Sequence, residues 1–187
     1  MTFEQVYQLV EKSSHETAFN REECEKMWEL ANTLKQGDLA VEVGLQFGRS
    51  ATVIASSAKE KGFKFIAIDS WDEEYSEAAQ KHVEEVLLKE LDLPIEIIIE
   101  DSKTAHSRIV GKVALLHIDG DHSYEGVLAD CKNFLPKVKK GGYACFDDYG
   151  HDSLPGVYQA VTEYMSENGG FKFEGRFGNK LGVFKKI

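Results

Sequence analysis

Two apolar runs of the chain end in acidic residues. The first leads into Asp119-Gly120-Asp121-His122, and the second leads into Asp147-Asp148. If these runs are neighbouring strands, their carboxylates meet at one edge of a sheet, where like charges repel unless a cation or hydrogen-bond donors hold them. Oxygen ligands favour Mg²⁺, Ca²⁺ or Mn²⁺ over zinc, and Mg²⁺ is the first expectation. Helix capping by the same side chains is the alternative.

A turn with two glycines follows an earlier apolar run. It reads Glu42-Val43-Gly44-Leu45-Gln46-Phe47-Gly48-Arg49-Ser50. At such a turn, free backbone N–H groups and the dipole of the next helix favour an anionic or nucleoside ligand. A tight turn without a ligand would also need glycines, and Ser50 could cap the helix or bond a carboxylate. The Gly-x-x-x-Gly spacing argues against a nicotinamide dinucleotide, whose fingerprint is Gly-x-Gly-x-x-Gly.

Polar residues also end the next two apolar runs. Asp69 lies about twenty positions after the glycines and can accept hydrogen bonds from both hydroxyls of a ribose, and Trp71 follows it closely. Asp101 and Ser102 end the third run, where a polar pair could recognise an adenine ring or cap a helix. Polar residues at three successive run ends predict a cofactor that contains a nucleoside.

The elements that must position these residues alternate between short apolar runs and amphipathic helices. Uniformly apolar strands joined by helices are typical of a parallel sheet buried on both faces, so we predict a doubly wound α/β fold. Only Arg176–Lys180 separates the last two runs, which predicts an antiparallel hairpin. The predicted strands span residues 39–43, 63–68, 95–99, 113–118, 143–146, 171–175 and 181–186. The predicted helices span 3–13, 21–35 and 155–168, and four others end near residues 61, 91, 109 and 135.

The composition is that of an ordinary globular domain. The chain has 187 residues, 42% of them hydrophobic and 29% charged, and no apolar run long enough to cross a membrane. We expect one cytoplasmic domain over residues 1–187, with 1–37 as a helical N-terminal appendage. A net charge of -10 disfavours nucleic acid and anionic membranes as partners. The lysines at 137, 139 and 140 are interpreted as a solvated helix end, and Cys24, Cys131 and Cys145 as reduced, mostly buried thiols.

The glycine turn together with Asp69 resembles the first two motifs of class I S-adenosylmethionine-dependent methyltransferases, whose sheet also ends in an antiparallel hairpin. The segments Ile118–Glu125, Asp147–Tyr149 and Pro155–Val157 are similar to the metal-dependent macrocin O-methyltransferase and cephalosporin-hydroxylase-like group, and the resemblance covers residues 38–187. It implies methylation of a small hydroxyl-bearing acceptor and metal ligands at Asp119, Asp147 and Asp148. The cofactor contacts that we expect are Glu42, Gly44, Gly48, Ser50, Asp69, Trp71, Asp101, Ser102 and Asp119.

Two residues compete for the role of general base. Asp121 corresponds by position to the base proposed for that group, whereas His122 holds the position of the base in related catechol-type enzymes, three residues after the first metal aspartate. A neutral imidazole is well suited to accept a hydroxyl proton near pH 7. Both assignments stay open here. Candidates for shaping the acceptor pocket are Trp71, Tyr75, His151, Asp152 and the N-terminal helices.

Two other functions fit the same motifs. One is a metal-dependent hydroxylase or hydrolase that uses the same aspartates, and the other is a non-catalytic module that binds S-adenosylmethionine. The presence of Asp119, Asp147 and Asp148 weighs against the non-catalytic module. A homodimer through the 171–187 edge is a further expectation.

Overall fold

The computed structural model describes residues 1–13, 19–72 and 76–187. Its strands are β1 (Leu39–Val43), β2 (Lys64–Asp69), β3 (Glu96–Ile99), β4 (Val113–Ile118), β5 (Val138–Phe146), β6 (Phe171–Phe177) and β7 (Leu181–Lys186). Within these described residues they form one sheet in the order β3-β2-β1-β4-β5-β7-β6. Strands β1 to β5 pair in parallel, and β7 runs antiparallel to β5 and β6. The predicted doubly wound, mostly parallel seven-stranded sheet with a C-terminal hairpin is confirmed.

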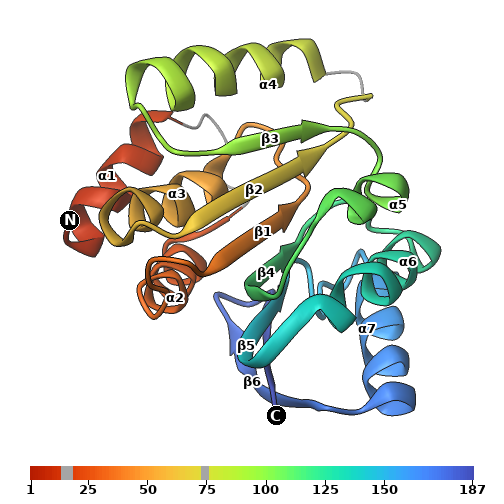
Figure 1. Ribbon diagram of the computed structural model, residues 1–187. Helices are drawn as coiled ribbons and strands as arrows, with labels where there is room; N and C mark the ends of the chain where they lie inside the picture. Colours follow the sequence, from red (N-terminus) through yellow and green to blue (C-terminus); the bar gives the residue numbers. More distant parts are fainter. Residues whose placement is uncertain (14–18, 73–75) are drawn as a thin grey trace.

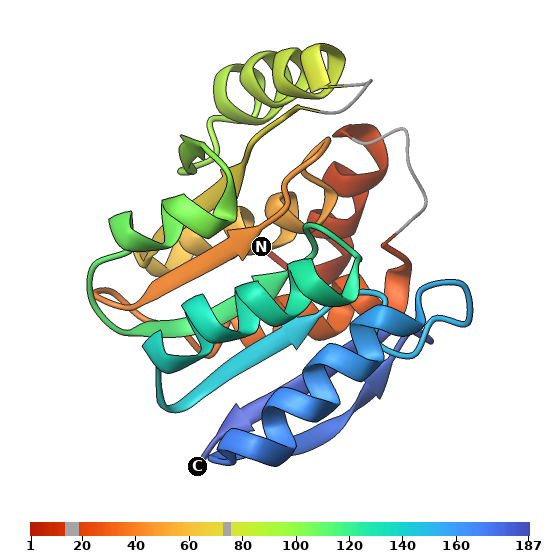
Figure 2. The ribbon, with the colours of Figure 1, turned by 90° about the vertical axis from the view of Figure 1, so that its right-hand side faces the viewer.

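Helices cover both faces of the sheet (Figures 1 and 2). One layer contains α1 (Phe3–Ser13), α2 (Arg21–Ala31), α3 (Arg49–Lys61) and α4 (Ser76–His82), which a π-helix (Val83–Glu90) continues; the other contains α5 (Ser102–Ala105), α6 (Tyr124–Phe134) and α7 (Pro155–Asn168). Because successive strand side chains point to opposite faces, neighbouring residues join different cores. Ala40 belongs to the hydrophobic cluster that contains α1, α2 and α3, whereas Val41 belongs to the cluster that contains α6 and α7.

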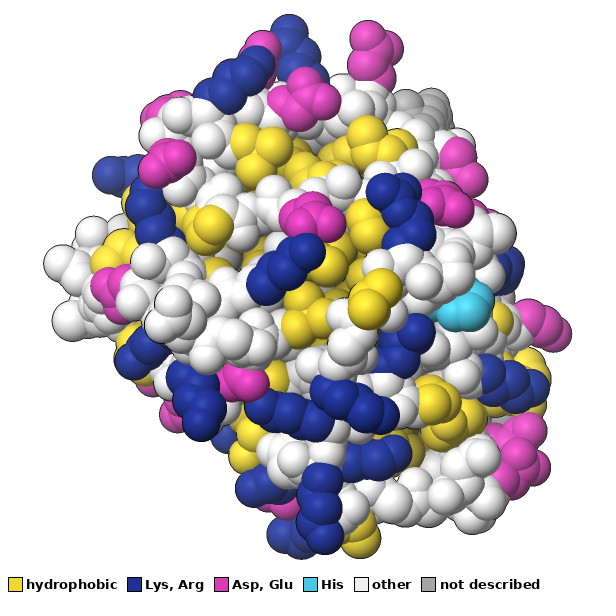
Figure 3. All heavy atoms as spheres, in the orientation of Figure 1, with side chains coloured by type: hydrophobic (Ala, Val, Ile, Leu, Met, Phe, Trp, Pro, Cys, Tyr) yellow, Lys and Arg dark blue, Asp and Glu magenta, His cyan; other side chains and the backbone are white. Residues whose placement is uncertain are grey.

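The interpretation of the lysine cluster as a helix end is wrong. Helix α6 ends at Phe134, and a 3-10 turn over Leu135–Lys137 follows, with Pro136 unable to continue the hydrogen-bond pattern of the helix. Strand β5 begins at Val138, earlier than predicted, so Lys139 and Lys140 lie in a strand. Figure 3 shows that Lys and Arg side chains gather at this end of the molecule, near the C-terminus.

Two predicted helices are shorter than expected. The helix predicted over 21–35 ends at Ala31, where Asn32 is its C-cap. The helix predicted to end near residue 109 consists of the four-residue α5 and a 3-10 turn, His106–Arg108. No helix of the described residues is long and apolar enough to cross a membrane. The three cysteines are free and buried, as predicted, and burial raises the pKa of the Cys24 thiol to about 12.

Strands β1 and β4 approach each other closely where they end. The Asp119 N–H donates to the carbonyl of Val43 at 2.7 Å, and the Gly44 N–H donates to the carbonyl of Ile68 in β2 at 2.9 Å. Gly44 has φ +86, and a Cβ there would overlap the carbonyl of Asp119. Only a glycine therefore allows this approach.

Replacing Gly44 with Ala is expected to destabilise the protein more than replacing Gly37 with Ala. Both glycines have positive φ, +86 and +89, so the left-handed backbone costs an alanine about 1–2 kcal/mol at either position. Overlap with Asp119 adds about 1–3 kcal/mol at Gly44 alone, because no described atom lies within 4 Å of a Cβ at Gly37. Urea unfolding curves of the two variants measure the difference, and equal free energies of unfolding would contradict the close approach.

Candidate functional site

A cavity of about 540 Å³ opens at the carboxyl ends of the parallel strands. The turn between β1 and α3 forms one wall. Gly48 is the N-cap of α3 with φ +79 and provides no side-chain cap, so the beginning of the helix stays open toward the cavity. A Cβ at Gly48 would overlap Leu87 of the π-helix. Both glycines of the predicted cradle are thus required by the backbone and by close packing.

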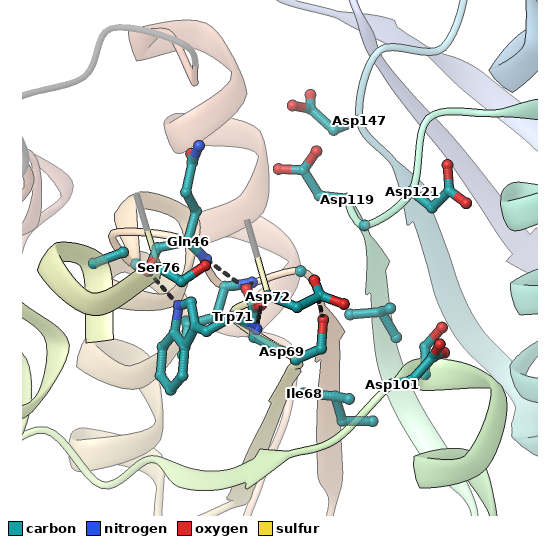
Figure 4. A pocket seen from close by; sticks show the side chains of 18 of the residues that line it. Gln46, Ile68, Asp69, Trp71, Asp72, Ser76, Asp101, Asp119, Asp121 and Asp147 are labelled. Atoms are coloured by element: carbon teal, nitrogen blue, oxygen red, sulfur yellow. Dashed lines mark hydrogen bonds between the residues drawn. The ribbon is translucent and has the colours of Figure 1, made fainter. Parts of the chain in front are cut away.

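Asp69 holds this turn in place from the end of β2. One carboxylate oxygen accepts hydrogen bonds from the N–H groups of Leu45 at 2.7 Å and Gln46 at 2.8 Å, and the other accepts from the Trp71 N–H at 2.8 Å. The indole N–H of Trp71 donates to the Gln46 carbonyl at 3.3 Å, so the aromatic ring is tied to the same turn (Figure 4). Asp69 therefore organises the cradle, in addition to lining the cavity.

Asp101 and Ser102 line the cavity from the end of β3. Asp101 is the N-cap of α5 and accepts from the Lys103 N–H at 2.8 Å. The Ser102 hydroxyl donates to Asp130 of α6 at 2.6 Å, and burial raises the pKa of the Asp130 carboxyl to about 6. The capping and the cofactor interpretations of this pair are compatible, because capping uses only one oxygen of Asp101.

Glu42 lies beneath the cavity and is not among its lining residues. Its carboxylate is fully buried, accepts from the Ser50 hydroxyl at 2.6 Å and lies 2.7 Å from Nδ1 of His117. Burial lowers the pKa of His117, but the hydrogen bond to Glu42 and the charges of Glu42, Asp119 and Asp147 outweigh it, so the net shift is upward. Ser50 thus bonds a carboxylate and leaves the cap of α3 to Gly48. Glu42 thus supports the turn from beneath, whereas Ser50 both bonds Glu42 and lines the cavity.

The side chains of Asp119, His122 and Asp148 lie close together, and Asp119 and His122 also line the cavity. His122 Nε2 lies 3.3 Å from Asp119 Oδ1 and 3.5 Å from Asp148 Oδ2, and one ligand atom from each of these three residues lies within 4.8 Å of the others. The hydrogen bond to Asp119 and the neighbouring carboxylates raise the pKa of His122 against the effect of burial. Two aspartates and an imidazole make a donor set that suits a divalent ion.

Asp147 and Asp148 share a cation that sequence reasoning did not include. Lys180 Nζ lies 2.6 Å from Asp147 Oδ2 and 3.1 Å from Asp148 Oδ1. Asp148 has φ +53, so the chain turns sharply and both successive aspartates reach the same ammonium group. Burial and the charge of Asp119 raise the pKa of Asp147 to about 7, although Lys180 opposes this shift.

Asp121 points away from this cluster. Its carboxylate accepts from the Ser123 N–H at 2.8 Å, in front of α6, and Figure 4 shows it directed away from Asp119 and Asp147. The hydrogen bond from the Ser123 N–H lowers the pKa of Asp121. Of the two candidates for the base, His122 is the one that contacts the other acidic residues of the site.

Only some of the residues predicted to shape the acceptor pocket line the cavity. Trp71 lines the cavity, whereas His151 and Asp152 are exposed and are not among its lining residues; Tyr75 lies outside the described residues. Phe19, which sequence reasoning missed, lines the cavity and places its ring edge against His117. Arg49 fixes this segment, because its guanidinium donates to the Phe19 carbonyl at 2.6 Å and to Glu11 at 2.7 Å.

Comparisons with known proteins agree with this architecture. The family model described as a methyltransferase domain matches residues 41–149. Rhamnosyl O-methyltransferase from Mycobacterium tuberculosis is 29% identical over 168 residues, covering 83% of this chain and 68% of that protein.

Solved structures share the fold at low sequence identity. TDP-rhamnose 3′-O-methyltransferase CalS11 superposes with a TM-score of 0.62 at 14% identity, covering 98% of this chain and 92% of that chain. A rRNA methylase from Streptococcus thermophilus gives a TM-score of 0.63 at 15% identity, covering 87% of this chain and 95% of that chain. Since these two act on different acceptors by their names, the fold alone leaves the acceptor open. The predicted resemblance to class I methyltransferases is confirmed, and the chain belongs to the methyltransferase domain family of enzymes.

Proposed function

We propose that this methyltransferase transfers the methyl group of S-adenosylmethionine to a hydroxyl oxygen of a small, sugar-like acceptor, with a divalent ion bound beside the cofactor. The observation that carries the proposal is a single cavity whose lining includes both the glycine turn and the acidic residues Asp119 and Asp147. A methyl donor and an activated hydroxyl must meet in such a space, because in-line transfer needs the reacting atoms in contact. The rhamnosyl specificity in the relative's name supports a sugar as the acceptor.

The cofactor is proposed to lie along the strand ends. Gly44 and Gly48 let the backbone approach the cofactor. Asp69 orders the turn and offers its remaining lone pairs to the ribose. Asp101 and Ser102 face the adenine ring. Trp71, held by Gln46, closes this side of the cavity. We propose that Glu42 supports the turn from below, and that Ser50, which lines the cavity, links Glu42 to the cofactor side.

A divalent ion fits the residues beside the cofactor. Carboxylate oxygens of Asp119 and Asp148 lie within 4.8 Å of each other, and the buried Asp147 Oδ1 has no hydrogen-bond partner among the described residues. These carboxylates can therefore hold an ion while the nearby His122 stays unbound to it. When bound, such an ion lowers the pKa of an acceptor hydroxyl and orients its oxygen. Asp119 and Asp148 are proposed as ligands, with Asp147 as a third carboxylate on the same side. This ligand set supports our proposal that the chain is similar to the metal-dependent macrocin-like methyltransferases.

His122 is proposed as the base. A ring nitrogen of the neutral imidazole accepts the proton of the acceptor hydroxyl while the oxygen forms a bond to the methyl carbon and the carbon–sulfur bond breaks, leaving S-adenosylhomocysteine. Asp121 is the weaker candidate because the Ser123 N–H lowers its pKa and holds it away from the cluster. A hydroxylase or hydrolase with the same aspartates is not favoured by membership of a methyltransferase family. We further propose that residues 1–187 act as one domain, since Phe19 and Arg49 join the N-terminal helices to the cavity.

Removing the Asp69 carboxylate is expected to weaken binding of S-adenosylhomocysteine by about tenfold or more, since a charge-assisted hydrogen bond contributes about 1.5–3 kcal/mol. Calorimetric titration of Asp69→Ala measures this loss. Asp72→Ala is the matched control, because Asp72 also lines the cavity but accepts its hydrogen bond from the Ser70 hydroxyl and not from the glycine turn. The affinity of this variant should stay within about twofold of the wild type. Equal affinities of Asp69→Ala and the wild type would remove Asp69 from the site.

Mg²⁺ at one hundred times its dissociation constant is expected to stabilise the wild type by about 2.7 kcal/mol. Asp119→Asn and Asp148→Asn should each lose this response and the methyl transfer that depends on metal, while binding of S-adenosylhomocysteine persists. Asp152→Asn is the control, since Asp152 is exposed outside the cavity lining. Thermal melts with Mg²⁺, Ca²⁺ and Mn²⁺ measure the effect. A melting temperature indifferent to all three, with transfer that survives chelation, would contradict the metal role.

A further inference from the structure

Lys180 is the last residue of the turn that joins β6 to β7, far along the chain from the other residues of the site. Its side chain is only 15% exposed, and its ammonium group bridges one oxygen of Asp147 and one oxygen of Asp148. Hairpin lysines are usually solvated, so a buried bridge between two carboxylates calls for a specific role.

The bridge decides which oxygens of the two aspartates lie outside the ion pair with Lys180. Lys180 contacts Asp147 Oδ2 and Asp148 Oδ1. That leaves Asp148 Oδ2, which faces His122, and Asp147 Oδ1, which is buried and has no hydrogen-bond partner among the described residues. Each aspartate therefore has one oxygen on Lys180 and one oxygen that Lys180 does not contact.

The charges of this group balance around one divalent ion. Asp119, Asp147 and Asp148 carry three negative charges when ionised, and Lys180 supplies one positive charge. A single divalent ion supplies the other two. While His122 is neutral, loss of the lysine would leave one carboxylate charge without a partner, which is costly because Asp147 and Asp148 are buried.

The position of Lys180 is fixed from two sides. The Lys180 carbonyl accepts from the Tyr149 N–H at 2.7 Å, next to the aspartates. The Asn20 side-chain amide, at the N-cap of α2, donates to the Gly178 carbonyl at 2.5 Å, and a Cβ at Gly178 (φ +55) would overlap Glu23. The N-terminus of α2 and the hairpin turn thus contact each other, and these contacts fix the backbone from which the Lys180 side chain reaches the carboxylates.

We propose that Lys180 is a positioning residue of the metal site: it holds one oxygen each of Asp147 and Asp148, leaves the other oxygen of each for an ion shared with Asp119, and so sets the affinity of this site for one divalent ion. The inference rests on the proposed function in that it concerns the proposed metal. Outer partners of this kind typically change metal affinity by about 10–100-fold when they are removed.

The test is Mg²⁺ and Mn²⁺ titration of the full chain by calorimetry, on the wild type, Lys180→Met and Lys172→Met. Methionine retains much of the volume without the charge, and Lys172, an exposed lysine of the same hairpin paired with Glu174, is the matched control. We expect one ion per chain in the wild type, at least about tenfold weaker binding in Lys180→Met and unchanged binding in Lys172→Met. Lys180→Arg, which keeps the charge, should recover part of the affinity.

A double-mutant cycle in the metal-free protein gives a second readout. If Lys180 acts through Asp147, the losses of unfolding stability in Lys180→Met and Asp147→Asn are not additive, and the double variant is more stable than their sum predicts. Metal affinity of Lys180→Met equal to that of the wild type, or additive stabilities, overturns the Lys180 proposal alone. A wild type that binds none of Mg²⁺, Mn²⁺ and Ca²⁺ overturns the proposed metal function, and the role of Lys180 in it.

Discussion

Negative charge concentrated at one sheet edge is the constraint on which the site depends. Parallel pairing of β1, β4 and β5 brings Asp119 and Asp147 to the same edge, and the left-handed backbone at Asp148 adds a third carboxylate. Repulsion and burial oppose their ionisation, as the raised pKa of Asp147 shows. The arrangement therefore needs cations and hydrogen-bond donors close by.

The protein supplies these groups from several elements. Lys180 comes from the C-terminal hairpin, and His122 from the loop before α6. One layer deeper, His117 and the Ser50 hydroxyl hold the buried Glu42 carboxylate. Glu42, Asp147 and Asp148 thus have donors from distant segments, whereas Asp119 has His122 from its own loop.

Hydrogen bonds also join the N-terminal helices to the sheet edge that carries the site. Arg49 ties Phe19 and Glu11 to the start of α3, and Asn20 binds the turn that holds Lys180. Both connections end on residues of the cavity or of the acidic cluster. A change in the packing of α1 or α2 is therefore expected to alter the site as well as the stability of the fold.

Much of this organisation followed from the sequence, because buried parallel strands and glycine turns have strong local patterns. The strand ends at Asp69, Asp101 and Asp119 could be located from apolar runs alone. The directions of side chains could not be predicted in this way. Asp121 turns toward the nearby Ser123 N–H, and Lys180 reaches Asp147 from a distant segment. The partnership of Glu42 with His117 had a faint signal, a histidine inside an apolar run, but only strand register makes the two neighbours. Lys139 and Lys140 misled because a proline-containing turn and a strand start look locally like a helix end.

The most direct test of the account is a crystal structure of the protein with S-adenosylhomocysteine and Mn²⁺, recorded with anomalous scattering. The account predicts the cofactor product along the glycine turn and one anomalous peak, with oxygens of Asp119 and Asp148 at about 2.0–2.6 Å from it. A structure with the product in the cavity and no ion at these carboxylates would contradict metal-assisted methyl transfer. Lys180 and His122 alone would then neutralise the carboxylates.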